Sequence, residues 1–167
     1  MANAMKFLCN KWALLAAVLV PTLALDQWTK WLVHTRFRVG ETLPLIDGFF
    51  SLTYIRNQGA AFGLLHTASP AFREPFFMAV PVIAVCVMSV LYYRLEAGQK
   101  CTALALALVI SGAIGNFIDR MRLGYVIDFL DAHWHEAYHW PAFNVADSCI
   151  VGGVILLFLL SLKPTSR

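Results

Sequence analysis

The sequence predicts an all-α membrane protein with four transmembrane helices and a small extracytoplasmic β-hairpin or sheet. Of its 167 residues, 59% are hydrophobic and 14% are charged, whereas soluble domains contain about a quarter charged residues. The mean hydropathy is +0.66, and the charged residues are unevenly distributed, so that long stretches of the sequence contain almost none. Apolar stretches of about 18–20 residues can cross a bilayer as helices. Such stretches leave too little sequence for a soluble core, so we expect residues 1–167 to form a single integral-membrane domain.

Four apolar stretches define the expected spans, at about residues 12–33, 75–93, 101–118 and 145–162. The first span also resembles a secretory signal peptide, because Lys6 and Lys11 precede its apolar run. However, that run is followed directly by Asp26, without a good cleavage site. We therefore interpret this segment as an uncleaved anchor that serves as the first span.

The connections between the spans differ in length, and this predicts the topology. Basic residues are denser in the short terminal-side segments than in the long opposite loops, which favours cytoplasmic termini. In the first long loop, Asp47-Gly48 is a turn signal between alternating stretches, and it predicts a hairpin on the membrane surface. The second, between Asp119 and Asn144, is rich in aromatic residues and His. We expect it to be a surface loop at the membrane interface.

Four carboxylates are expected at the edges of the spans or inside the outer leaflet: Asp26, Asp119, Asp128 and Asp147. Ionisable groups at this depth are functional candidates, because contact with lipid disfavours them. Each also has a structural interpretation. Asp26 could form an i, i+4 pair with Lys30, Asp119 could pair with Arg120 at the interface, and Asp128 could be an ordinary loop residue.

Asp147 has a structural interpretation of its own, because Asn144-Val-Ala-Asp147 resembles a helix-capping box. The topology nevertheless brings Asp119, Asp128 and Asp147 to one membrane level. Two neighbouring carboxyl groups in a low-dielectric site share a proton. Such a pair can activate a water for attack on an amide and protonate the leaving nitrogen. This is aspartic-protease chemistry, which requires no metal and no cofactor.

The segment HEAYH, at residues 135–139, predicts a competing chemistry. It matches the HExxH pattern of zinc metalloproteases, which needs a helix that presents both imidazoles on one face. Pro141 follows closely and the segment lies in a polar loop, so we favour a solvated or interfacial loop. A small transporter or proton-relay protein is a further alternative, since membrane carboxylates also carry ions, and a structural scaffold is another. Four spans without an inverted repeat are few for a transporter.

Five segments of the chain resemble those of the bacterial lipoprotein signal peptidases (signal peptidase II). They are LDQWTK at 25–30, NQGAAFG at 57–63, GAIGNFIDR at 112–120, YVIDF at 125–129 and FNVADSCI at 143–150. The resemblance implies an intramembrane aspartic endopeptidase of the bacterial cytoplasmic (inner) membrane, with its active site near the outer leaflet. Its substrates would be diacylglyceryl-modified prolipoproteins, cleaved before the lipid-modified cysteine. We expect membrane lipid as a further partner, no nucleic acid, and a monomeric protein.

The same resemblance implies roles for individual residues. Asp128 and Asp147 would be the catalytic pair. Asn57, Asn116, Arg120 and Asn144 would hold the substrate backbone and orient the pair. Asp26 and Asp119 would give polar support, with Asp119 positioning Arg120. Gly59 would allow close approach of the NQGAAFG loop.

Small residues predict where the third and fourth spans touch. They are Ser111, Gly112, Gly115, Gly152 and Gly153. Small side chains let two membrane helices approach closely. This contact would bring Asn116 near the start of the fourth span.

Overall fold

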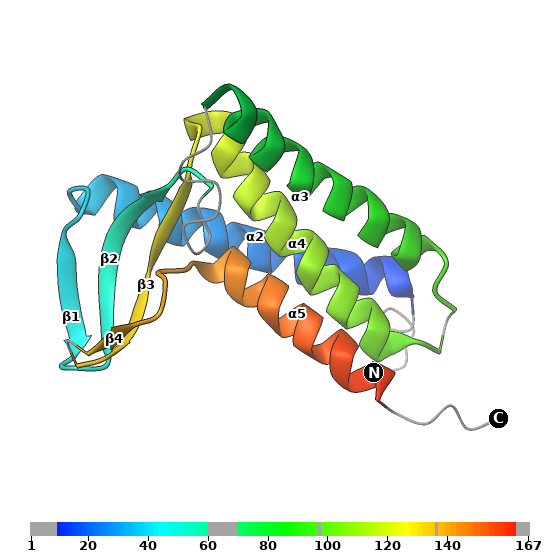
Figure 1. Ribbon diagram of the computed structural model, residues 1–167. Coiled ribbons are helices and arrows are strands. Elements are labelled where there is room, and N and C mark those ends of the chain that lie inside the picture. Colours follow the sequence, from blue (N-terminus) through cyan, green and yellow to red (C-terminus); the bar gives the residue numbers. More distant parts are fainter. Residues whose placement is uncertain (1–9, 60–69, 97, 136, 163–167) are drawn as a thin grey trace.

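The computed structural model describes residues 10–59, 70–96, 98–135 and 137–162, and Figure 1 shows a helical bundle with a small sheet at one end. The helices are α2 (Lys11–Arg36), α3 (Pro70–Tyr93), α4 (Lys100–Leu123) and α5 (Val145–Ser161). The strands are β1 (Thr42–Ile46), β2 (Phe50–Asn57), β3 (Val126–Trp134) and β4 (Tyr138–His139). The predicted combination of apolar helices with a small sheet is confirmed.

Three helical segments of the described chain are long and apolar enough to cross a membrane: α2, α4 and the Pro75–Tyr93 part of α3. Helix α5 is apolar but has 17 residues. At about 1.5 Å per residue it measures about 26 Å, slightly less than the roughly 30 Å of a bilayer core. The predicted fourth span therefore stays a prediction. Helices α2 and α4 also continue past their apolar stretches, to Arg36 and Leu123.

Helix α4 is the centre of the bundle and packs against α2, α3 and α5 (Figure 1). Glycines allow α4 and α5 to touch. A Cβ atom at Gly112 would overlap the carbonyl oxygen of Ala146, and one at Gly153 would lie 2.6 Å from the carbonyl oxygen of Ala105. The prediction of a close α4–α5 contact is confirmed at these positions. It is wrong for Gly152, because no atom lies within 4 Å of a Cβ built there.

The sheet is antiparallel with the order β1-β2-β3-β4. The predicted turn between β1 and β2 is present, and Gly48 there has φ +77°. The second long connection was expected to be a surface loop, but it contains β3 and β4. Strand β3 forms because it pairs with β2, which places Ile55 opposite Asp128.

An apolar cluster holds the sheet against the end of the bundle. Tyr54 of β2 packs with Ile127 and Phe129 of β3 and with Val33 of α2, and all four are buried. The start of β3 is thereby fixed beside the start of α5, and Phe143 just before α5 forms an antiparallel bridge with Leu130. The fold therefore brings the residues on either side of the second long connection together.

Candidate active site

Asn144 begins α5 as its N-cap. Its Oδ1 accepts a hydrogen bond from the backbone N–H of Asp147 (2.9 Å), and its own backbone N–H donates to Asp147 Oδ2 (3.2 Å). This reciprocal arrangement is the capping box expected from the sequence. The box fixes the Asp147 carboxyl group at the end of the bundle that carries the sheet.

The side-chain amide of Asn144 also binds Asp128. Its Nδ2 donates to Asp128 Oδ1 (2.7 Å) and to the carbonyl oxygen of Ile127 (3.2 Å). Asn57, the last residue of β2, donates from Nδ2 to the other oxygen, Asp128 Oδ2 (2.9 Å). Asn144 is 0% exposed and Asp128 is 2% exposed. One buried asparagine therefore contacts both carboxyl groups, Asp147 through its cap and Asp128 through its amide.

The surroundings of Asp128 change its acidity. Burial, together with the charge of Asp147, raises the pKa of Asp128 to about 7, while hydrogen bonds from Asn57 and Asn144 and the charge of Lys30 act in the opposite direction. A carboxyl group with a pKa near the working pH can both hold and release a proton. The position thus has the acidity that general acid–base chemistry requires.

Gly59 stabilises the position of Asn57. Its backbone N–H donates to Asn57 Oδ1 (2.9 Å), which leaves Nδ2 directed at Asp128. Gly59 has φ +111°, and a Cβ atom there would overlap the ring of Phe77 in α3. Both the backbone conformation and the lack of space require glycine. The expected close approach is found at Gly59, while residues 60–63 of the NQGAAFG segment lie outside the described chain.

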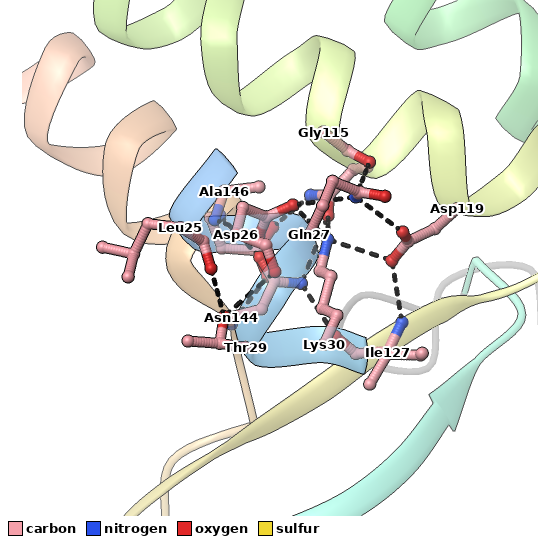
Figure 2. A network of polar contacts seen from close by, with 12 residues as sticks. Leu25, Asp26, Gln27, Thr29, Lys30, Gly115, Asp119, Ile127, Asn144 and Ala146 are labelled. Carbon is pink, nitrogen blue, oxygen red and sulfur yellow. Dashed lines mark hydrogen bonds and ion pairs between the residues drawn. The ribbon is translucent and has the colours of Figure 1, made fainter. Parts of the chain in front are cut away.

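Polar residues of α2 and α4 form a second group next to Asp147. Asn116 Nδ2 donates to Asp147 Oδ1 (2.7 Å), and Asn116 Oδ1 accepts from Lys30 Nζ (2.9 Å). Lys30 also forms ion pairs with Asp26 and Asp119, both at 2.9 Å (Figure 2). Asp26, Lys30 and Asp119 are 2%, 2% and 3% exposed. Eight of the nine site residues predicted from the sequence therefore belong to one continuous network, together with Lys30.

Arg120 lies beside this network. Its guanidinium carbon is 5.9 Å from the ring centroid of Phe77, and it interacts electrostatically with Asp147, Asp128 and Asp119. The expected ion pair between Arg120 and Asp119 is not found among the described residues. Asp119 uses its oxygens otherwise, because Oδ2 binds Lys30 and Oδ1 accepts from Gln27 Nε2 (3.0 Å).

Sequence reasoning missed Gln27 and Lys30 as parts of the site. Gln27 Nε2 binds both Asp119 and the carbonyl oxygen of Gly115 (3.3 Å). The signal was available for Lys30, since a lysine four residues after an aspartate inside an apolar span requires a buried partner. No comparable signal identified Gln27.

The HEAYH segment does not form a helix in its described residues. His135 has φ +51° in a turn, Tyr138 and His139 form β4, and Glu136 lies outside the described chain. The His139 ring stacks on the ring of His133, with centroids 4.7 Å apart. The helical presentation that an HExxH zinc site needs is therefore not present in these residues.

An apolar helical bundle with two carboxyl groups at one end, Asp128 buried and able to exchange a proton near neutral pH and Asp147 partly buried, has the features of a membrane-embedded hydrolase. Comparisons with known proteins agree with this class. Residues 18–163 match the family model described as signal peptidase (SPase) II. The chain belongs to the signal peptidase II family and is a membrane peptidase.

Individual relatives cover nearly the whole chain. The lipoprotein signal peptidase of Geobacter sulfurreducens is 51% identical over 151 residues, which is 90% of this chain and 92% of that one. The lipoprotein signal peptidase of Geobacter metallireducens is 46% identical over 146 residues, 87% and 88% of the two chains. A solved structure of a bacterial membrane enzyme aligns with a TM-score of 0.79 at 34% identity and covers 91% of this chain and 89% of its own. These relatives favour the peptidase over the transporter, scaffold and metalloprotease alternatives.

Proposed function

We propose that the chain removes the signal peptide from diacylglyceryl-modified prolipoproteins by cleaving before the lipid-modified cysteine, with Asp128 and Asp147 as its catalytic residues. The substrate class is supported by the relatives, which are lipoprotein signal peptidases. One observation supports the catalytic pair above all: two carboxyl groups from different elements contact the same buried asparagine, Asn144.

In the proposed mechanism Asp147 is the base and Asp128 is the acid. Asp147 takes a proton from a water molecule as the water oxygen attacks the carbonyl carbon of the scissile peptide. Asp128 then gives its proton to the leaving amide nitrogen as the C–N bond breaks. A pKa of about 7 lets Asp128 keep this proton at neutral pH. The assignment rests on this pKa and not on the hydrogen bonds, because each carboxyl group accepts two N–H donors: Asp147 from Asn116 and Asn144, and Asp128 from Asn57 and Asn144.

The proposed orientation places this pair near the outer leaflet. Helix α5 completes four spans, both termini are cytoplasmic, and the sheet lies at the outer membrane surface. Trp134, Tyr138 and Trp140 are exposed on the sheet side, as aromatic residues at a membrane interface are. A lipid-bearing cysteine lies in the outer leaflet, so its peptide would reach the pair at this depth. One chain supplies both carboxyl groups, so a monomer is sufficient.

Substitution of each carboxyl group tests the proposal. We expect Asp128→Asn and Asp147→Asn each to lower kcat by about 10²–10⁴-fold, since each removes a general acid or base. Cleavage is measured by the gel shift of a diacylglyceryl-modified prolipoprotein, with equal amounts of folded, membrane-inserted enzyme.

Asp131→Asn is the matched control, because Asp131 lies on the same strand as Asp128 but pairs with His139. We expect it to cleave at close to the rate of the unmodified chain. Near-normal cleavage by Asp128→Asn or Asp147→Asn would reject the catalytic pair.

A further inference from the structure

Lys30 uses all three donors of its ammonium group. Nζ contacts Asp26 Oδ2, Asp119 Oδ2 and Asn116 Oδ1, each at 2.9 Å. The side chain is 2% exposed, so water does not compete for these donors. An ammonium group has three N–H donors and no acceptor, and here the three are matched by three acceptors from helices α2 and α4.

The residue of each of these acceptors also forms a hydrogen bond with one of the proposed catalytic aspartates or with the residue just before it. Asp26 Oδ1 accepts from the backbone N–H of Ala146 (2.9 Å), the residue before Asp147. Asp119 Oδ2 accepts from the backbone N–H of Ile127 (3.2 Å), the residue before Asp128. Figure 2 shows Asp26 and Asp119 on either side of Lys30, with Ala146 and Ile127 at the outer ends of these two branches.

The third branch reaches the carboxyl group of Asp147 itself. Because Asn116 Oδ1 accepts from Lys30, Asn116 Nδ2 is turned towards Asp147 Oδ1 (2.7 Å). A reversed amide would place its NH₂ group against the ammonium group of Lys30, where two donors would face each other. Asn144 Nδ2 also donates to Asn116 Oδ1 (3.2 Å), so the lysine and Asn144 together determine which end of the Asn116 amide faces Asp147.

We propose that Lys30 is a positioning residue for catalysis, which holds Asp128 and Asp147 in register through Asp119, Asp26 and Asn116. The inference rests on the proposed function, because it assumes that these two aspartates react. Lys30 does not touch either of them; it acts through the residues that hold the start of α5 and the start of β3. A lysine that only neutralised buried charge would need neither the Asn116 contact nor the two backbone branches.

The test compares Lys30→Met with Lys30→Arg in a cleavage assay on a diacylglyceryl-modified prolipoprotein. Since displacements of about 1 Å can lower a rate about 100-fold, we expect Lys30→Met to reduce kcat per folded molecule about 100-fold. We expect KM to stay within about twofold, because Lys30 does not face the substrate. Lys30→Arg keeps the charge but replaces three converging donors by a planar fork, so we expect a partial loss of kcat.

The pH profile and the rate report on different effects of Lys30. The charge of Lys30 opposes the rise of the Asp128 pKa, so Lys30→Met moves the fall of activity at high pH to still higher pH, whereas Lys30→Arg keeps the profile near that of the unmodified chain. Arg120, Asp26 and Asp119, which also carry charge around the pair, are kept in both variants. Because loss of the charge alone shifts the profile, positioning is measured as kcat per folded molecule at the pH optimum of each variant. A purely structural role would lower only the folded fraction and leave this kcat unchanged.

Two further variants keep the test decisive. Lys30→Met with Asp119→Asn removes one positive and one negative charge, so it reports on positioning if the single variant does not fold. Lys11→Met is the matched control, because Lys11 binds the carbonyl oxygens of Tyr93 and Leu95 at the other end of the same helix (2.7 and 2.8 Å); we expect its kcat to be unchanged.

The outcomes distinguish the two proposals. Unchanged kcat at the pH optimum in folded Lys30→Met, with Asp147→Asn inactive, would overturn the positioning role alone. Active Asp147→Asn would overturn the catalytic pair itself. Loss of kcat in Lys30→Met with a shifted profile, and no loss in Lys11→Met, is the result that supports the proposal.

Discussion

Strand β3 carries two aspartates in different surroundings. At the start of the strand, Asp128 is 2% exposed and two asparagine amides bind it. Three residues later, Asp131 pairs with the exposed His139 at 3.2 Å. The start of the strand packs on the helical bundle, whereas its far end reaches β4 at the edge of the sheet (Figure 1). The comparison shows that the burial and the hydrogen-bond partners of an aspartate on this strand depend on the elements packed around it.

Asn144→Ala should have the largest effect on the buried end. The change removes the amide that binds Asp128 and the cap that holds Asp147. We expect kcat to fall about 10²–10³-fold, as on loss of one preorganised donor, and the free energy of unfolding to fall by about 1 kcal/mol or more from the lost cap. Cleavage kinetics and thermal unfolding in detergent measure the two effects.

Asn10→Ala is the control for this variant. Asn10 is the N-cap of α2, and its Oδ1 accepts from the backbone N–H of Trp12 (3.0 Å). It should lose a similar stability with no change in kcat. Equal kcat in Asn144→Ala and Asn10→Ala would mean that capping alone explains Asn144.

The activity should depend on pH through Asp128. The pKa of Asp128 is raised to about 7, so its proton is present at lower pH and is lost as the pH rises through about 7. Activity should fall about tenfold per pH unit above that value, since the acid form disappears in that proportion. The stability that the protonated form contributes is complete below about pH 4, the ordinary pKa of aspartate, and is lost by the same rise in pH.

Measuring kcat and unfolding from pH 5 to pH 9 checks this prediction. Asp131→Asn should leave the fall of activity in place, because Asp131 pairs with His139 and with neither residue of the proposed pair. A flat profile up to pH 9 would contradict the role of Asp128 as the acid.

Gly112→Ala should have a moderate effect, by moving the helix that carries Asp147. The new Cβ atom would overlap the Ala146 carbonyl oxygen, and overpacking of this kind destabilises by about 1–3 kcal/mol. We expect kcat to fall about tenfold, as a displacement smaller than about 1 Å would produce.

Gly152→Ala is the matched control on α5, because no atom lies within 4 Å of a Cβ there. It should retain full activity and gain up to about 1 kcal/mol from the better helix former. Equal losses in the two variants would show that the α4–α5 contact does not position the site.

The smallest effect is expected at the exposed end of β3. His139→Ala removes the ion pair with Asp131 and the stacking on His133. Exposed pairs contribute about 0.2–1 kcal/mol, and we expect kcat to stay within about twofold because no residue of the proposed pair is touched. A chelator should likewise leave cleavage unchanged. Strong inhibition by either treatment would restore the zinc alternative.

Much of the bundle could be predicted from the sequence, because apolar stretches long enough to cross a bilayer rarely form anything other than membrane helices. The helix ends could not. The hydropathy pattern stops at Ile118, but α4 continues through Asp119 and Arg120 to Leu123. The charge of Asp119 is balanced by Lys30 from another helix, and a pattern along one segment contains no information about such a partner.

Long-range pairing limited the rest of the prediction. Strand β3 was missed because VIDFLDAHW becomes a strand by pairing with β2, more than 60 residues earlier. The two catalytic candidates could be named from the motifs, and the capping box from the spacing of Asn144 and Asp147. The three acceptors of Lys30 lie on two helices, and only the one at i−4 was visible in the sequence.

The split origin of the two aspartates has a mechanical consequence. Asp128 belongs to the sheet and Asp147 to a helix of the bundle. The distance between the two carboxyl groups therefore depends on how the sheet packs against the helical bundle. A force or a small molecule that tilts the sheet away from the helices would separate the two carboxyl groups without contacting either one. An inhibitor of this kind would act by separating the sheet from the helices. Mutations that cause resistance to it would lie at the boundary between sheet and bundle and would leave the two proposed catalytic aspartates unchanged.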